Sequence, residues 1–212
     1  GVAFDGAGNL YVADTGNLRV RMVGPDDTIR SSREFVIVTP GYAHEGGGQY
    51  RVYQPHGIAA DASGNAYVSI PAHGLILRVS PNGVFETVAQ GLRQPTGLAL
   101  DGAGNLYIAE TGNNRILRRT PEGILFAVAG KSRIPTRARA APTWNGPEGV
   151  AIDERGNLYV ADTGNHRVRR MSPDGSIVTV TGRGAPGFGG DGGPAVAAFL
   201  RSPRGLAADA AA

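Results

Sequence analysis

The sequence predicts an all-β fold of four-stranded antiparallel sheets that repeat along the chain. Five segments share the pattern Gly-apolar-Ala-apolar-Asp, and their first residues are 56, 40, 52 and 56 positions apart. The 212 residues include 33 Gly and 14 Pro, which are typical of tight turns, and 41% are hydrophobic. Several short strands in each unit of 40 or more residues are the pattern of a β-propeller blade.

The first repeat shows how each strand is predicted. Residues 1–5 and 10–13 form the first two strands, and the glycines and asparagine between them accept the positive φ of a hairpin turn. A polar turn at 14–17 leads to a third strand at 19–23. A further turn at Pro25-Asp26-Asp27 precedes the fourth strand. In the four repeats the fourth strands are expected at residues 34–38, 85–89, 125–129 and 177–181.

The recurring segment also sets the predicted boundaries of the repeats. We expect a single domain, 1–212, with repeats at 1–56, 57–96, 97–148 and 149–204. Residues 205–209 repeat only the first strand and are expected to form one extra inner strand. Because an unpaired strand edge invites pairing with another chain, a homodimer through open blade edges is predicted, with a closed four-bladed ring as the alternative.

Composition excludes several classes of protein. The chain has no Cys, so disulfides and cysteine-ligated metal sites are excluded. Its 21 basic residues exceed the 18 acidic ones by little and are scattered, so nucleic acid is not an expected partner. No apolar run approaches the roughly 18 residues of a membrane span. The sequence motifs of serine hydrolases, zinc peptidases and P-loop enzymes are absent, which favours a non-catalytic protein.

Three stretches resemble a known repeat family. GNLYVADTGNLRV at 8–20, GNLYIAETGNNRIL at 104–117 and GNLYVADTGNHRVR at 156–169 resemble NHL repeats. Residues 182–209 resemble the inter-blade connection of bacterial and teneurin-type NHL proteins. The resemblance implies a β-propeller and favours an extracellular or periplasmic location. It also implies either a binding, adhesion or sensing role, or a metal-dependent lyase or lactonase.

An acid and an arginine recur at fixed positions around the turn between the second and third strands. The second repeat has Ile70 and Leu75 at these positions, so the acid and the base disappear together. Loss of one member of a buried ion pair costs several kcal/mol, which predicts that the two side chains form structural pairs. These pairs are Asp14 with Arg19, Glu110 with Arg115, and Asp162 with Arg167.

The predicted binding face is the one that carries the connections between repeats. Connections of roughly 15, 5, 17 and 21 residues lie on this face, and insertions confined to one face of a repeat protein are typical of binding. His73, in the altered turn of the second repeat, and Trp144 are candidate contacts there. Trp144 would form a basic and aromatic patch with Arg133, Arg137 and Arg139, whereas His166, at a variable turn position, is expected to be solvated.

Each inner strand begins with Pro-x-Gly, and the variable middle residue is predicted to lie at the mouth of the propeller channel. The four residues are His56, Thr96, Glu148 and Arg204. Such a polar ring suits a small polar ligand or a protein partner. The alternative is a metal-assisted lyase or lactonase centred on His56 and Glu148, since the His of the PHG segment is similar to the active-site His of some propeller lyases. No cofactor is expected, although zinc at His56 and Glu148 or calcium at Asp191 are the candidates.

Overall fold

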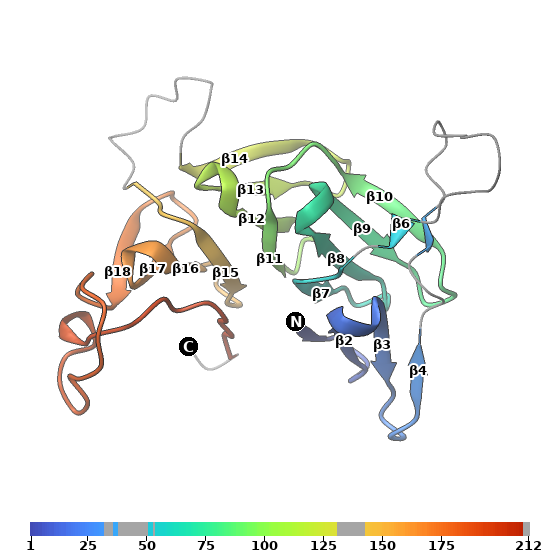
Figure 1. Ribbon diagram of the computed structural model, residues 1–212, viewed down its shortest axis with the longest axis horizontal. Coiled ribbons are helices and arrows are strands. Elements are labelled where there is room, and N and C mark those ends of the chain that lie inside the picture. Colours follow the sequence, from blue (N-terminus) through green and yellow to red (C-terminus); the bar gives the residue numbers. More distant parts are fainter. Residues whose placement is uncertain (32–35, 38–50, 53, 131–142, 210–212) are drawn as a thin grey trace. The chain divides into compact units, whose positions relative to one another are not determined.

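The computed structural model describes residues 1–31, 36–37, 51–52, 54–130 and 143–209 (Figure 1). These residues form four four-stranded antiparallel sheets and one two-stranded sheet, with short 3-10 turns and no α-helix among them. The predicted class, an all-β chain of β-propeller blades, is confirmed. By its internal contacts the chain divides into unit 1, residues 1–92, and unit 2, residues 93–212, each with two of the four-stranded sheets.

Each four-stranded sheet is a blade of consecutive strands. Blade 1 contains β1 (Val2–Phe4), β2 (Leu10–Asp14), β3 (Arg19–Val23) and β4 (Ile29–Ser31). Blade 2 contains β7 (Ile58–Ala60), β8 (Ala66–Ile70), β9 (Leu75–Val79) and β10 (Phe85–Ala89). Blade 3 contains β11 (Pro95–Leu100), β12 (Leu106–Glu110), β13 (Arg115–Arg119) and β14 (Leu125–Gly130). Blade 4 contains β15 (Pro147–Ile152), β16 (Leu158–Asp162), β17 (Arg167–Met171) and β18 (Ile177–Thr181).

Shorter elements connect the strands. A 3-10 turn joins the second and third strands of every blade: η1 (Thr15–Asn17), η2 (Pro71–His73), η3 (Thr111–Asn113) and η4 (Thr163–Asn165). The turn η5 (Ala195–Ala197) lies in the connection that follows blade 4, and β5 (Val36–Ile37) pairs with β6 (Arg51–Val52) in the connection that follows blade 1.

The fourth strand of blade 1 was predicted at the wrong place. It is β4, directly after the Pro25 turn, and not the segment at 34–38. Asp26 closes this turn by accepting hydrogen bonds from the backbone N–H and the hydroxyl of Thr28, at 3.2 and 2.6 Å. The chain therefore reverses at once and sets Ile29 opposite Val23. Residues 34, 35 and 38 lie outside the described residues.

The turn between the first two strands is built around an aspartate. Asp5 Oδ1 accepts the backbone N–H groups of Ala7 and Asn9, and Oδ2 accepts the Asn9 amide and the Tyr11 hydroxyl. Burial works to raise the pKa of Asp5, but these hydrogen bonds together hold it below its usual value, while burial and Asp5 raise the pKa of Tyr11 to about 12. Asp61, Asp101 and Asp153 repeat the arrangement.

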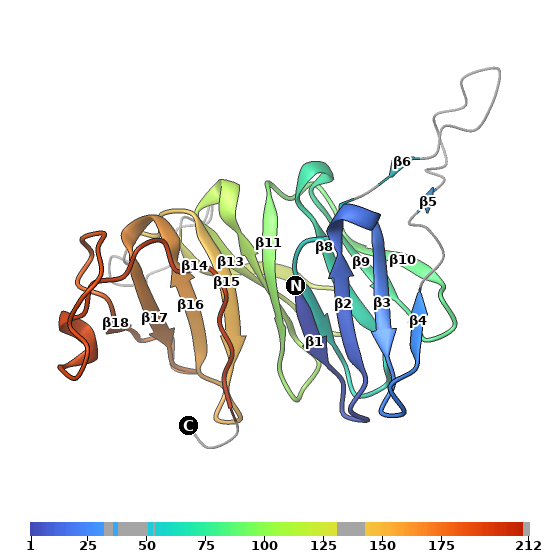
Figure 2. The same cartoon turned by 60° about the horizontal axis from the view of Figure 1, so that its bottom comes forward.

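Neighbouring blades within each unit pack through their first strands, β1 beside β7 and β11 beside β15. The glycine of Pro-x-Gly permits this close approach, because a Cβ at Gly97 would overlap the carbonyl oxygen of Glu148. A Cβ at Gly149 would overlap the carbonyl oxygen of Arg204 in the same way, so the chain at 204–206 runs beside β15 (Figure 2). Residues 205–209 thus follow the path of the predicted inner strand, but they form no ladder with any described strand.

Each unit has its own apolar core between its two blades. In unit 1 the core contains Tyr11 and Val20 from blade 1 and Val68, Ile70 and Leu77 from blade 2. In unit 2 the corresponding cluster draws on both blades and on the connection before blade 4, and it contains Tyr107, Ile116, Trp144, Val160 and Met171. These cores hold the ends of the blades in place, where the candidate site residues lie.

Candidate binding face

In each blade the 3-10 turn and the connections between blades lie at the same end of the antiparallel strands, which we call the connection face. In three blades the threonine that begins this turn donates its hydroxyl to the carbonyl oxygen of the next Pro-x-Gly proline. The bonds are Thr15 to Pro55 at 2.6 Å, Thr111 to Pro147 at 2.6 Å and Thr163 to Pro203 at 2.8 Å. The turn of one blade therefore fixes the start of the following inner strand.

The repeated acids of this face do form ion pairs, and in two blades the structure shows a pair with an arginine other than the predicted one. Glu110 pairs with Arg115 as expected. Asp14 Oδ2 lies 2.6 Å from Arg21 Nε, and Asp162 Oδ2 lies 2.8 Å from Arg169 Nε. In both cases the partner is two positions beyond the predicted arginine.

The sequence explains this choice of partner. Blades 1 and 4 have arginine on the same face of the third strand two residues after the first, whereas blade 3 has Leu117 there. Arg167, which was predicted to pair with Asp162, donates instead from Nη2 to the carbonyl oxygen of Arg183 at 3.0 Å. Blade 2 has Ile70, Leu75 and Leu77 at the three positions, and Ile70 and Leu77 are fully buried in the core of unit 1.

The acids also hold backbone in place. The side chains of Glu110 and Asp162 are fully buried. Glu110 Oε1 accepts the backbone N–H of Arg93 at 2.8 Å, and Asp162 Oδ1 accepts that of Asn145 at 2.9 Å. Each acid thereby ties the incoming connection to its own blade. An acid with an arginine, a backbone N–H and a turn asparagine as partners is built for structure.

The variable middle residues of the Pro-x-Gly segments in unit 2 contact one another. In unit 2, Arg204 Nε lies 3.4 Å from Glu148 Oε2, and the Arg204 side chain is 71% exposed against 20% for Glu148. Thr96 is buried, and its hydroxyl contacts the Thr111 hydroxyl at 2.7 Å and donates to the Glu148 carbonyl oxygen at 3.0 Å. The structure thus brings Thr96, Glu148 and Arg204 together. His56 is exposed and belongs to unit 1.

Comparison with known proteins identifies the repeats. The family model of the NHL repeat matches residues 92–118 and 145–171, which hold the first three strands of blades 3 and 4. These two segments match the NHL repeat. No curated protein matches the chain.

Solved structures with similar folds differ widely in what their names say. Virginiamycin B lyase from Staphylococcus aureus matches with a TM-score of 0.61 and 18% identity over 84% of this chain and 53% of its own. An auxiliary nutrient binding protein from Bacteroides ovatus ATCC 8483 matches with a TM-score of 0.69 and 20% identity over 98% of this chain and 53% of its own. The chain thus spans about half the length of these two structures, and at such identities the likeness shows the fold alone.

Two further residues predicted to lie on the variable face of the NHL repeats have different environments. His73 is exposed at the end of η2. Trp144 is only 4% exposed, and the Arg169 guanidinium lies 5.3 Å from its ring centroid. The prediction of Trp144 as a surface contact was therefore wrong, because its indole fills the core of unit 2. The three arginines expected beside it, at 133, 137 and 139, lie outside the described residues.

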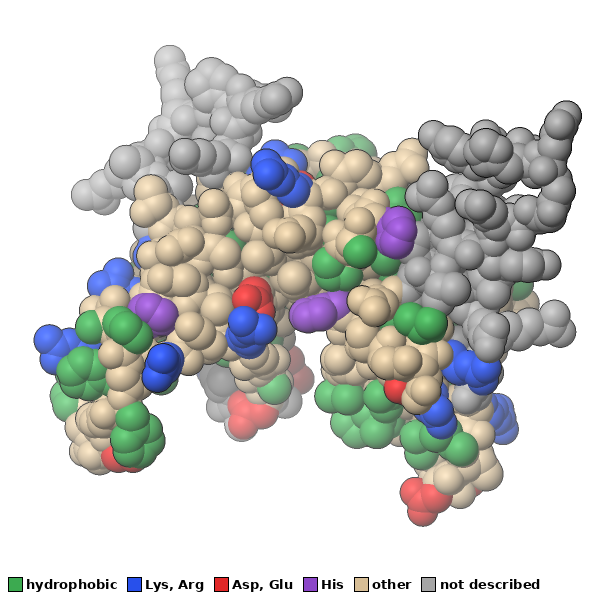
Figure 3. Space-filling model, in the orientation of Figure 1, with side chains coloured by type: hydrophobic (Ala, Val, Ile, Leu, Met, Phe, Trp, Pro, Cys, Tyr) green, Lys and Arg blue, Asp and Glu red, His purple; other side chains and the backbone are tan. Residues whose placement is uncertain are grey.

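Figure 3 shows acidic, basic and histidine side chains in small groups on the face it draws. No described helix is long and apolar enough to cross a membrane.

His166 has a structural role that the sequence did not reveal. It ends the 3-10 turn of blade 4 with a φ of 53°, and its Nδ1 accepts the backbone N–H of Ser202 at 3.1 Å. In blade 3 the equivalent Asn114 accepts the backbone N–H of Gly146 at 2.6 Å. Both acceptors hold the residue before the next Pro-x-Gly. The sequence could have indicated this role, because a side chain that accepts a hydrogen bond recurs at this position of the NHL repeat. It is Asn in blade 3 and His in blade 4.

Replacing His166 with leucine is expected to lower the free energy of unfolding by about 1 kcal/mol, because the Ser202 N–H loses its acceptor. Leucine itself is tolerated at this backbone conformation, since Leu18 has a φ of 58° in blade 1. The matched variant His166→Asn should retain the bond and unfold at nearly the unaltered urea concentration. Equal losses in the two variants would show that the bond contributes nothing.

Proposed function

We propose that this NHL-repeat chain is a non-catalytic binding module that holds a small, hydroxyl-rich polar ligand on its connection face. The contact residues are Glu148 and Arg204 in unit 2, with Thr96 supporting the backbone between them. The observation that carries the proposal is the Glu148–Arg204 pair, in which the Arg204 side chain is 71% exposed and the Nε–Oε2 separation is 3.4 Å. Such a pair retains donors and acceptors for a ligand.

The contrast with the other acids of unit 2 supports this choice. Glu110 and Asp162 are fully buried, and each has an arginine, an asparagine and a backbone N–H as partners. Glu148 instead occupies the variable position of Pro-x-Gly and remains partly exposed. A ligand can therefore reach Glu148 without disturbing the hydrogen bonds that hold the blades.

The chemistry of the pair favours a sugar-like ligand. A carboxylate accepts hydrogen bonds from hydroxyl groups, and a guanidinium donates to hydroxyl or carboxylate oxygens. Thr96 supports the arrangement by donating to the Glu148 carbonyl oxygen at 3.0 Å. The names of two structures with similar folds, nutrient binding proteins from Bacteroides, are compatible with a ligand of this class.

Isothermal titration with a panel of neutral and acidic mono- and oligosaccharides tests the proposal. At least one sugar should bind saturably, and Arg204→Ala and Glu148→Gln should each weaken it at least about tenfold, because each removes a charge-assisted hydrogen bond. Arg155→Ala is the matched control, since Arg155 is exposed on the turn between β15 and β16. Absence of binding across the panel, or binding that survives both substitutions, would contradict the proposal.

The alternative is a metal-assisted lyase or lactonase centred on His56 and Glu148. One solved structure with a similar fold is a virginiamycin B lyase, and this similarity supports the alternative. His56 and Glu148 belong to different units, and the described residues hold no group of three or more His, Asp or Glu arranged to bind a metal. Metal analysis of the purified protein discriminates between the two functions.

The homodimer expected from residues 205–209 stays a prediction that rests on the sequence. Those residues form no ladder with any described strand, so their backbone groups retain the capacity to pair with another chain. Light scattering would check it, and a species near 22 kDa at high concentration would contradict it.

A further inference from the structure

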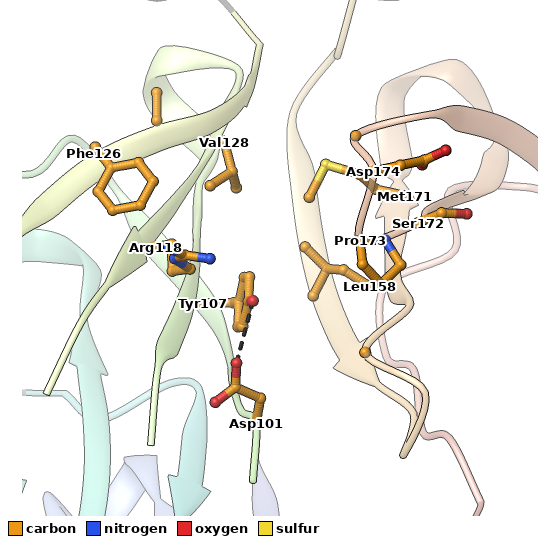
Figure 4. A pocket seen from close by; sticks show the side chains of 13 residues that line it. Asp101, Tyr107, Arg118, Phe126, Val128, Leu158, Met171, Ser172, Pro173 and Asp174 are labelled. Carbon is orange, nitrogen blue, oxygen red and sulfur yellow. Dashed lines mark hydrogen bonds between the residues drawn. The ribbon is translucent and has the colours of Figure 1, made fainter. Parts of the chain in front are cut away.

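Unit 2 contains a groove between its two blades, at the opposite end of the strands from Glu148 and Arg204. Its volume is about 450 Å³, and it is lined by β12 to β14 of blade 3 and by the turn after β17 of blade 4. Figure 4 shows Arg118, Tyr107 and Phe126 on one side, with Leu158, Met171 and Pro173 facing them. The groove thus combines a cation, two aromatic rings and an apolar wall.

Arg118 is the unusual residue in this groove. Its guanidinium carbon lies 4.8 Å from the centroid of the Phe126 ring, which stands directly opposite it on β14. Its Nε is buried and has no hydrogen-bond partner in the structure. A buried donor of a charged group without a partner is costly, and it marks a place where an acceptor is missing.

Blade 2 shows what such an arginine does when an acid is available. Arg78 occupies the equivalent position, and Glu86 lies directly opposite it on β10. The distance between Arg78 Nη2 and Glu86 Oε2 is 2.6 Å. Blade 3 has Phe126 where blade 2 has Glu86. Arg118 is therefore placed as Arg78 is, but with an aromatic platform instead of a carboxylate.

The two acids that line the groove are already engaged. Asp101 accepts the backbone N–H groups of Ala103 and Asn105, the Asn105 amide and the Tyr107 hydroxyl. Asp174 accepts the N–H of Ser176, and its carboxylate is turned away from Arg118 (Figure 4). Neither acid is therefore a partner of Arg118 Nε, and the side-chain hydrogen bond of this guanidinium is with Tyr107.

We propose that this groove binds a small monocarboxylate with an aromatic or apolar body. The carboxylate pairs with the Arg118 guanidinium, as Glu86 pairs with Arg78, and forms a charge-assisted hydrogen bond that neither Asp101 nor Asp174 supplies. The body of the ligand lies against Leu158, Met171 and Val128. This site is separate from the proposed sugar site, and neither depends on the other.

The corresponding groove of unit 1 supplies the control substitution. It has a volume of about 340 Å³ and is lined by the equivalent residues of blades 1 and 2. Met22 holds the position of Arg118, and the arginine of this groove, Arg30, comes from the exposed outer strand. Arg118→Met is thus a change that the fold already accommodates at the equivalent place.

Titration of the full chain with 4-phenylbutyrate, followed by ligand-observed NMR, tests the proposal. Saturable binding is expected, and Arg118→Met should weaken it at least about tenfold. Phe126→Glu should abolish it, because the new carboxylate would pair with Arg118 as Glu86 pairs with Arg78. The neutral ligand 4-phenylbutyramide should bind at least about tenfold more weakly than the acid.

Two controls separate this site from other causes. Arg78→Met and Arg204→Ala should leave the affinity for 4-phenylbutyrate unchanged, and circular dichroism melts should show that Arg118→Met and Phe126→Glu remain folded. The proposal is overturned if 4-phenylbutyrate does not bind, if the amide binds as well as the acid, or if Arg118→Met retains the affinity of the unaltered chain.

Discussion

Replacing Gly97 with alanine is expected to lower the free energy of unfolding by about 3 kcal/mol. A Cβ at this position would overlap the carbonyl oxygen of Glu148 and would lie 3.0 Å from Gly149 Cα. Both neighbours are backbone atoms of β15, so no flexible side chain can move aside. The inner strands of blades 3 and 4 would have to separate, which would also disturb the start of β15 where Glu148 lies.

Urea denaturation followed by circular dichroism measures this loss. The matched control is Gly102→Ala, in the turn after β11, where an added Cβ would meet no atom within 4 Å and φ lies outside the left-handed region. That variant should stay within about 0.5 kcal/mol of the unaltered chain. Equal stability of Gly97→Ala and Gly102→Ala would show that β11 and β15 do not pack as closely as described.

The second large effect is expected at the buried acid of blade 3. Arg115→Leu should lower the free energy of unfolding by about 3 kcal/mol, because it leaves the fully buried Glu110 carboxylate without its cation. Adding Glu110→Ile should recover part of this loss. The double variant has Ile, Leu and Leu at positions 110, 115 and 117, the combination that blade 2 has at 70, 75 and 77.

A double-mutant cycle in urea measures the coupling between the two side chains. The recovery is expected to be incomplete, since the Arg93 N–H also loses its acceptor in the double variant. Arg155→Leu, at an exposed position, should change stability by less than about 0.5 kcal/mol. Simple addition of the two single losses would show that Glu110 and Arg115 act independently.

The blades could be predicted from the sequence because their signals are local. The aspartate of each Asp-x-x-Gly-Asn turn accepts hydrogen bonds from the backbone of that same turn, as Asp5 shows. The turn reverses the chain, so the strands before and after it run antiparallel. The position of β4 was missed because the turn before it is short, so that pairing already begins at Ile29. The residues at 34–38 are more apolar, and the fourth strand was therefore predicted there.

The partners of the site residues were harder to predict because they depend on contacts across the fold. Asp14 was expected to pair with the arginine directly opposite, and it pairs with Arg21, one step along the same face. Trp144 follows a long polar connection in sequence, but its ring packs into the core of unit 2. The roles of Arg118 and His166 likewise emerge only when equivalent positions of different blades are compared in space.

The central claim is that the buried acids hold the blades while Glu148 and Arg204 remain available to a ligand. Amide chemical-shift mapping during titration with a sugar that binds in the panel tests it most directly. The account predicts shifts centred on residues 96, 148 and 204, with the amides around Asp101 and Asp153, at the opposite ends of the strands, unmoved. Shifts confined to those turns, with residues 148 and 204 unchanged, would contradict it.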